Sequence, residues 1–117
     1  MKFYWYPKCS TCQRAKKFLE SRNINYEERH ILIETPDINE LHKYIKKSNK
    51  DINKFFNTSG LKYRELNLKE KLKSLSYDEK LSLLTGDGML IKRPLLILDN
   101  IVLIGFNEKE WSEFIWK

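Results

Sequence analysis

The chain has few of the residues that hold small proteins together covalently or through metal ions. Among its 117 residues are two cysteines and two histidines, His30 and His42. A structural zinc site needs four ligands, and these histidines are too far apart for the usual spacing of such sites. A disulfide between cysteines this close in sequence would barely constrain the unfolded chain, so it would add little stability. We therefore expect no metal and no bound cofactor.

Long apolar runs are also lacking. No run approaches the roughly 20 residues that cross a bilayer, so we expect no membrane contact. The first residues, Met1–Pro7, are too short and too soon interrupted by proline to be the apolar part of a secretion signal. A cytoplasmic location is then expected, where thiols stay reduced and disulfides are usually transient and catalytic.

Acidic residues are outnumbered, with 16 Asp and Glu against 22 Lys and Arg, which gives a net charge of +6. The densest basic stretch, residues 43–50, belongs to an expected helix with one apolar side. Elsewhere lysines alternate with acids, as in Lys69-Glu70-Lys71. This pattern is typical of a solvated surface, so direct binding to nucleic acid is not expected.

Both cysteines fall in one motif, Cys9-Ser10-Thr11-Cys12, which follows an apolar run and opens a basic helical stretch. A C-x-x-C motif at a strand-to-helix junction is typical of redox proteins. Unpaired N–H groups at a helix start favour a thiolate, the reactive form of cysteine. We expect Cys9 to attack and Cys12 to resolve the mixed disulfide. Two inert buried thiols are the alternative.

The order of predicted elements is β-α-β, then helices, then β-β-α. We expect strands at Lys2–Tyr6, Asn25–Ile31, Leu95–Leu98 and Ile101–Ile104. The first two should be parallel through a right-handed crossover, and the last two should form a hairpin. With C-x-x-C after the first strand, this order predicts a thioredoxin-like α/β fold with a mixed sheet. The expected organisation is one domain, residues 1–117, with a helical insertion at about 35–88.

Several helix ends carry capping signals. Ser10 with Gln13, and Ser76 with Glu79, each have the spacing of a capping box. Pro36 suits the first position of another helix. That helix is expected to bury Ile38, Leu41 and Ile45, and the last helix, capped by Asn107, to bury Trp111, Phe114 and Ile115.

Arg93-Pro94 directly precedes the third strand. In a thioredoxin-like fold this turn lies beside the dithiol, so Pro94 should shape the edge where substrate approaches. The sequence leaves its isomer open, since most X-Pro bonds are trans. The Arg93 guanidinium would stabilise the thiolate or hold an anionic group of the substrate. The alternative is an ordinary surface arginine.

Spaced blocks along nearly the whole chain resemble the arsenate reductase (ArsC)-like family, which includes the Spx transcriptional regulators. The blocks are Pro7–Cys12, Phe56–Gly60, Tyr63–Leu66, Gly88–Pro94 and Gly105–Glu108. The resemblance implies a thioredoxin-like fold with inserted helices and Cys9 as the attacking thiol.

The family's arsenate reductases hold the oxyanion with three arginines besides the cysteine. Arg93 matches one of them, and the other two positions fall at Asn57 and Gly105. Each charge-assisted bond to an anion contributes about 1.5–3 kcal/mol, so the loss of two should weaken oxyanion binding by several powers of ten. Arsenate reduction is thus the third of three functions considered.

The Spx branch binds the RNA polymerase α-subunit and uses its dithiol as a switch. Its polymerase-contact glycine corresponds to about Asp51 here, which disfavours the same interface. We therefore predict first a thiol-disulfide oxidoreductase restored by thioredoxin or glutathione, and second a redox-controlled RNA polymerase regulator. Its substrate would be a protein or small-molecule thiol or disulfide, bound by the side chains of Ser10, Thr11, Asn57 and Pro94.

Overall fold

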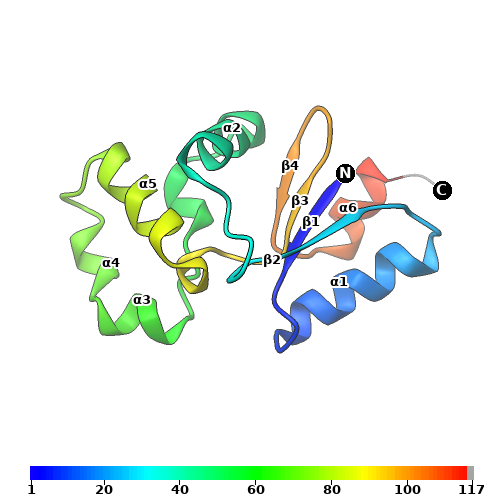
Figure 1. Cartoon of the computed structure of the whole chain (residues 1–117), viewed down its shortest axis with the longest axis horizontal. Coiled ribbons are helices and arrows are strands. Elements are labelled where there is room, and N and C mark those ends of the chain that lie inside the picture. Colours follow the sequence, from blue (N-terminus) through cyan, green and yellow to red (C-terminus); the bar gives the residue numbers. More distant parts are fainter. Residues whose placement is uncertain (116–117) are drawn as a thin grey trace.

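The computed structural model of the chain describes residues 1–115 and contains one four-stranded mixed sheet, in the order β2-β1-β3-β4 (Figure 1). The strands are β1 (Lys2–Trp5), β2 (Glu27–His30), β3 (Leu95–Ile97) and β4 (Val102–Ile104). β1 and β2 are parallel, whereas β3 is antiparallel to both β1 and β4. The predicted parallel pair and the predicted hairpin are both confirmed.

Successive side chains of the strands enter two separate cores, because a strand alternates its faces. Phe3, Leu96 and Leu103 face α1 (Ser10–Ser21) and α6 (Glu108–Phe114), where Trp111 is fully buried. Both helices lie on the same side of the sheet in Figure 1. Because both faces of the sheet are buried, residues 3–5 of β1 and all of β3 are apolar, and apolar and polar side chains do not alternate along them.

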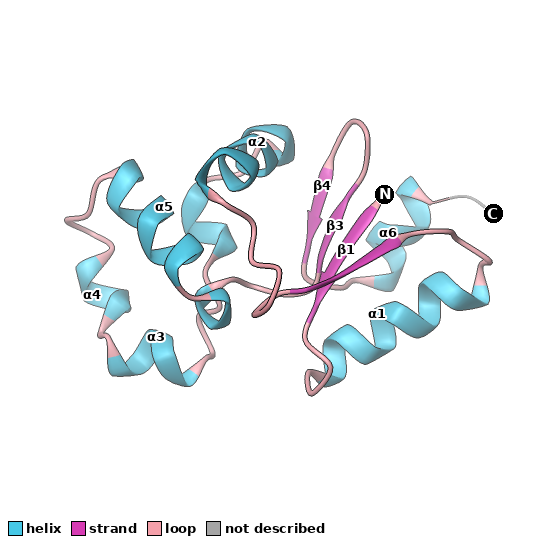
Figure 2. Ribbon diagram, viewed as in Figure 1, coloured by secondary structure: helices cyan, strands magenta, loops and turns pink. Residues whose placement is uncertain are grey.

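The helices that lie between β2 and β3 form a group on the opposite side of the sheet (Figure 2). These are α2 (Ile38–Ser48), the 3-10 helix η1 (Ile52–Phe55), α3 (Leu61–Glu65), α4 (Leu68–Lys71), α5 (Tyr77–Gly86) and the 3-10 helix η2 (Gly88–Leu90). Tyr4 from β1 joins this core and shares a 3.1 Å hydrogen bond with Tyr44 of α2. The inserted helices are thus tied directly to the central strand.

The start of η2 meets the residue that follows β2 at a glycine. A Cβ at Gly88 would collide with the carbonyl oxygen of Ile31, so no side chain fits there. The same carbonyl accepts a 2.6 Å hydrogen bond from the Thr35 hydroxyl. This close approach fixes where the chain returns toward β3.

Three local predictions are wrong. Ser10 does not cap α1: Cys9 is the N-cap, and Gln13 donates its side-chain N–H to the Pro7 carbonyl instead. Pro36 does not begin α2, because Asp37 forms a capping box with Glu40 and leaves Ile38 first in the helix and 50% exposed.

The third wrong prediction concerns Phe114, which is 43% exposed. α6 ends at this residue, and the chain is extended at Ile115, so the helical spacing that would bury Phe114 does not continue. The predicted Asn107 cap and the Ser76–Glu79 capping box are both confirmed.

The strand order and directions, with C-x-x-C after β1, establish the predicted thioredoxin-like α/β fold. Within residues 1–115, no helix combines the length and the apolar character that crossing a bilayer requires.

Trp111→Phe tests the link between α6 and the sheet. The Trp111 indole N–H donates a 3.1 Å hydrogen bond to the buried Gly105 carbonyl. Phenylalanine would leave that carbonyl unpaired and a small void, so we expect unfolding to become easier by about 1–3 kcal/mol in urea denaturation. Phe114→Ala is the matched control on the same helix, with an expected change within about 1 kcal/mol. Equal losses in both variants would contradict the assigned packing.

Candidate active site

Cys9 occupies the turn between β1 and α1. Its N–H donates to the Tyr6 carbonyl at 3.0 Å, and its own carbonyl accepts the first α1 hydrogen bond from Gln13. As the N-cap residue, Cys9 accepts a hydrogen bond at its sulfur from the Cys12 N–H, 3.3 Å away. The half-exposed thiol therefore takes the capping position where helices favour an anionic acceptor.

Cys12 lies one turn further along α1 and is fully buried, with both thiols reduced. Burial and a hydrogen bond to the Cys9 thiol raise the pKa of Cys12 to about 12, against smaller opposing effects of a Tyr6 backbone group and the Arg93 charge. Cys12 is therefore a neutral thiol directly beneath a solvent-accessible one.

Arg93 enters the site from the segment before β3. It lies over the Tyr6 ring, 5.2 Å from its centroid, and donates one Nη hydrogen to the Met89 carbonyl at 3.3 Å. Its Nε is buried and has no hydrogen-bond partner among residues 1–115. A buried donor without an acceptor is costly, and an anion in the site would satisfy it. The Arg93-Pro94 peptide bond is cis, and the Pro94 carbonyl accepts from the Gly105 N–H.

A short antiparallel pairing brings the inserted helices to Cys9. Phe56 and Ile91 form an isolated β-bridge. On either side of it, Asn57 N–H donates to the Leu90 carbonyl at 2.8 Å and Lys92 N–H donates to the Phe55 carbonyl at 2.7 Å. The pairing fixes residues 55–57, which are far from Cys9 in sequence, next to the Arg93 segment.

These segments enclose an open pocket of about 540 Å3 above the Cys9 thiol. It is lined by Cys9, Thr11, Asn57, Ser59, Gly60, Lys92, Arg93, Ile104, Gly105, Phe106 and Asn107. Four of the predicted site residues, Cys9, Thr11, Asn57 and Arg93, thus come together around one cavity. Its size suits a small molecule or an extended peptide segment.

The remaining predicted site residues lie outside the lining of this pocket. Ser10 is exposed on the first turn of α1, while Cys12 and Pro94 are buried behind the pocket wall. Neither the Ser10 nor the Thr11 hydroxyl donates to the Cys9 sulfur among the described residues; the Cys12 amide does. Ser10 therefore has no visible part in the pocket.

Lys92 is the residue that sequence analysis missed. Gly105 has a φ of +73°, a conformation that favours glycine, and a Cβ built there would lie 3.1 Å from Lys92 Cε and 3.8 Å from its Nζ. The lysine side chain therefore passes over the space that a side chain at position 105 would fill. The only signal in the sequence was its place beside Arg93, in the run Lys92-Arg93-Pro94.

The site combines a pocket that holds an accessible thiol and two cations with a second thiol that is buried outside the pocket lining. This set suits attack on a sulfur electrophile whose other groups are anionic. Within residues 1–115, no three His, Cys, Asp or Glu side chains gather closely enough to hold a metal ion.

Comparisons with family models, known sequences and solved structures all point to one family. The model of the ArsC family matches residues 4–114. The uncharacterized protein YusI of Bacillus subtilis strain 168 is 55% identical over 95% of this chain and 94% of its own length. The regulatory protein MgsR of the same organism is 32% identical over 92% of this chain and 84% of its own.

A solved structure from Bacteroides fragilis, of a protein related to the ArsC family, superposes with a TM-score of 0.93. It is 44% identical and covers 97% of this chain and 96% of the other. Similarity over almost the full length supports a common fold that includes the inserted helices.

Alkylation kinetics test the different environments of the two thiols. In a Cys9→Ser variant, burial still raises the pKa of Cys12, so Cys12 should react with iodoacetamide at about pH 8 much more slowly than free cysteine does. In Cys12→Ser, Cys9 should react at a rate comparable to free cysteine or faster. Mass spectrometry of timed samples measures both rates. Faster labelling of Cys12 than of Cys9 would reverse the assignment.

Proposed function

Since this chain belongs to the ArsC family, we propose that it is a thiol-disulfide oxidoreductase with Cys9 as its nucleophile and Cys12 as its resolving thiol. The observation that carries the proposal is the pairing of two unlike thiols: Cys9 opens into a pocket, and the buried Cys12 donates its backbone N–H to the Cys9 sulfur. Cys9 is therefore placed to react with a substrate, whereas Cys12 is placed to react only with Cys9.

The reaction would proceed in two exchanges. The Cys9 thiolate attacks one sulfur of a substrate disulfide, a Cys9–substrate disulfide forms, and the other substrate sulfur leaves as a thiolate that takes a proton from water. Cys12 then loses its proton to solvent and attacks the Cys9 sulfur. The second substrate thiol is released, and a Cys9–Cys12 disulfide remains. Two electrons have passed from the dithiol to the substrate.

The raised pKa of Cys12 has a role in this order of events. A neutral, buried Cys12 does not compete with Cys9 for external disulfides. Once Cys9 is bound to substrate, the attack is intramolecular and benefits from proximity.

Other residues of the pocket would orient the substrate. Arg93 places a buried, unpaired N–H donor and a positive charge near Cys9, which suits a leaving thiolate or a carboxylate. Thr11 and Asn57 both line the pocket and offer polar contacts. Pro94 would present the substrate edge, and Ser10 would act only at the outer rim of the motif.

A reductant must restore the dithiol after each cycle. We propose thioredoxin or glutathione in the cytoplasm, because each supplies electrons by the same thiol exchange. The substrate would be a disulfide of a protein or of a small thiol.

A redox-controlled regulator that binds the α-subunit of RNA polymerase is the second candidate, favoured by the similarity to the regulatory protein MgsR. In this case the dithiol would switch a surface and not turn over. Asp51, near the position where the Spx resemblance places a polymerase-contact glycine, is exposed and caps η1 by accepting from the Asn53 N–H. A carboxylate with its own capping role makes a poor replacement for a contact glycine.

Mixed-disulfide trapping tests the oxidoreductase. Cys12→Ser should accumulate a disulfide between Cys9 and the substrate, because the resolving thiol is missing. Cys9→Ser should form none and should lose exchange with glutathione disulfide. Intact-mass spectrometry before and after dithiothreitol measures both. Wild-type exchange no faster than free dithiothreitol would count against turnover.

The same trapping experiment can be paired with a pull-down that uses the C-terminal domain of the RNA polymerase α-subunit. We expect no binding that depends on the redox state of the dithiol. A complex of micromolar or tighter affinity in one redox state, together with background exchange, would establish the regulator instead.

Arsenate turnover is expected to be negligible with either glutathione and glutaredoxin or thioredoxin as reductant. The positions of two family arginines are Asn57 and Gly105, and losing two charge-assisted contacts should lower the rate by several powers of ten. Coupled NADPH oxidation measures it, with an arsenate reductase of the family as positive control. Comparable rates would mean that Lys92 and Arg93 suffice for oxyanion binding.

A further inference from the structure

A second pocket adjoins the thiol pocket and is strongly cationic. It is lined by four lysines, Lys54, Lys69, Lys73 and Lys92, with Phe56 and Tyr63 among its other residues. We propose that this lysine pocket binds the anionic part of a low-molecular-weight thiol, a carboxylate- or phosphate-bearing group with at least two negative charges, while its sulfur reacts at Cys9. The proposal rests on the oxidoreductase function above and names the class of its substrate.

Lys92 connects the two pockets, because it lines both of them. The antiparallel pairing of residues 55–57 with 90–92 runs along this boundary, so Asn57 lines the thiol pocket and Phe56 the lysine pocket. A molecule that occupied both pockets would therefore have to pass Lys92.

The charge of the lysine pocket has little compensation. None of its lining residues is acidic. Lys73 pairs with Glu70 at 3.2 Å across an exposed turn, which offsets one of the four charges. Like charges gathered in one concavity repel one another, and a polyanion relieves that repulsion.

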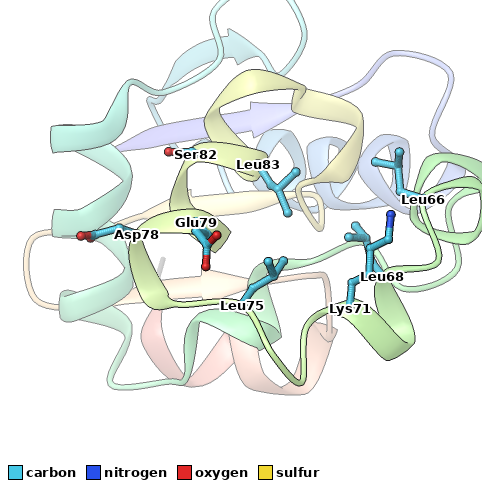
Figure 3. A pocket seen from close by; sticks show the side chains of 8 residues that line it. All are labelled: Leu66, Leu68, Lys71, Leu75, Asp78, Glu79, Ser82 and Leu83. Atoms are coloured by element: carbon cyan, nitrogen blue, oxygen red, sulfur yellow. The ribbon is translucent and has the colours of Figure 1, made fainter.

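The leucine-lined hollow between α4 and α5 differs from the lysine pocket in the charge of its lining (Figure 3). It is lined by Leu66, Leu68, Leu75 and Leu83, with both Asp78 and Glu79 beside its single lysine, Lys71. Along α4 and the turn after it, Lys69 and Lys73 therefore line the lysine pocket, while Lys71 between them lines the leucine-lined hollow.

The size and floor of the lysine pocket favour a small molecule over a protein segment. It encloses about 380 Å3, within the range of small-molecule sites. Phe56 is buried at its base and meets the Tyr63 ring at 6.4 Å between centroids, which gives a compact apolar floor under the lysines. Such a floor suits the carbon chain that joins a thiol to its charged groups.

In the proposed reaction, Cys9 attacks the small-thiol sulfur of a mixed disulfide. The Cys9–small-thiol disulfide forms, and the partner sulfur leaves as a thiolate and is protonated by water. Cys12 then attacks Cys9 and releases the small thiol, whose anionic group leaves the lysine pocket with it. Thioredoxin or glutathione reduces the resulting Cys9–Cys12 disulfide.

Direct binding tests the lysine pocket without any turnover. The probes are the unreactive thioethers S-methylglutathione, which carries carboxylates, and S-methyl-coenzyme A, which carries phosphates, with neutral S-methyl-pantetheine as reference. Isothermal titration at low salt should show at least one anionic probe binding about tenfold or more tightly than the neutral one. Which anionic probe is tighter distinguishes carboxylate from phosphate. Equal affinity for all three would overturn the proposal.

Two charge-matched double variants locate the binding. Lys54→Gln with Lys69→Gln removes two charges from the lysine pocket, and we expect about tenfold weaker binding of the tighter probe. Lys46→Gln with Lys71→Gln removes the same total charge elsewhere and should bind as the wild type does. Equal losses in both doubles would show a general charge effect and overturn the site.

The kinetic test uses the ratio of exchange rates with an anionic disulfide and with neutral 2-hydroxyethyl disulfide. That ratio should fall about tenfold in the Lys54/Lys69 double variant and stay unchanged in the Lys46/Lys71 double variant. Absence of exchange with every disulfide would refute the oxidoreductase function, while the thioether titration would still decide the lysine pocket. Lysine-dependent binding of a polyglutamate peptide, tighter than either thioether, would replace the small thiol with an acidic protein segment.

Discussion

The candidate active site depends on one short antiparallel pairing, between residues 55–57 and residues 90–92. Two backbone hydrogen bonds, from Asn57 to Leu90 and from Lys92 to Phe55, hold a loop of the inserted helices against the segment that leads into β3. The sheet and α1 place the thiols, but this pairing supplies the opposite wall. Without it, Cys9 would stand on an open helix end and not in a cavity.

The two thiols differ because α1 buries Cys12 and leaves Cys9 accessible. The cysteines are three residues apart, yet Cys9 caps α1 at its exposed end and Cys12, in the first turn, faces the core. The fold thereby gives two identical side chains different surroundings, and desolvation disfavours the charged form of Cys12. Arg93 lines the pocket beside Cys9, and its charge also acts on Cys12, where it opposes part of the rise in pKa.

Local patterns predicted most of the fold, because strands with two buried faces and well-spaced caps leave clear signals. They failed where two residues competed for one role: Cys9 against Ser10 for the α1 cap, and Asp37 against Pro36 for the start of α2. The C-x-x-C and Arg93-Pro94 motifs pointed to Cys9, Thr11 and Arg93, which line the candidate pocket. Lys92 had only its place beside Arg93 as a signal, because its position in the pocket depends on the 55–57 pairing and on the absence of a side chain at Gly105, which no local pattern encodes.

The missing side chain at Gly105 leaves its space to a neighbour. Lys92 Cε lies 3.1 Å from where a Cβ at position 105 would stand, so a side chain there would require the end of the lysine to shift by a few tenths of an ångström. The backbone is the stronger obstacle, because the left-handed conformation at this glycine strains any residue that has a Cβ. Gly105→Arg would therefore be opposed mainly by the conformation of its own backbone and much less by Lys92.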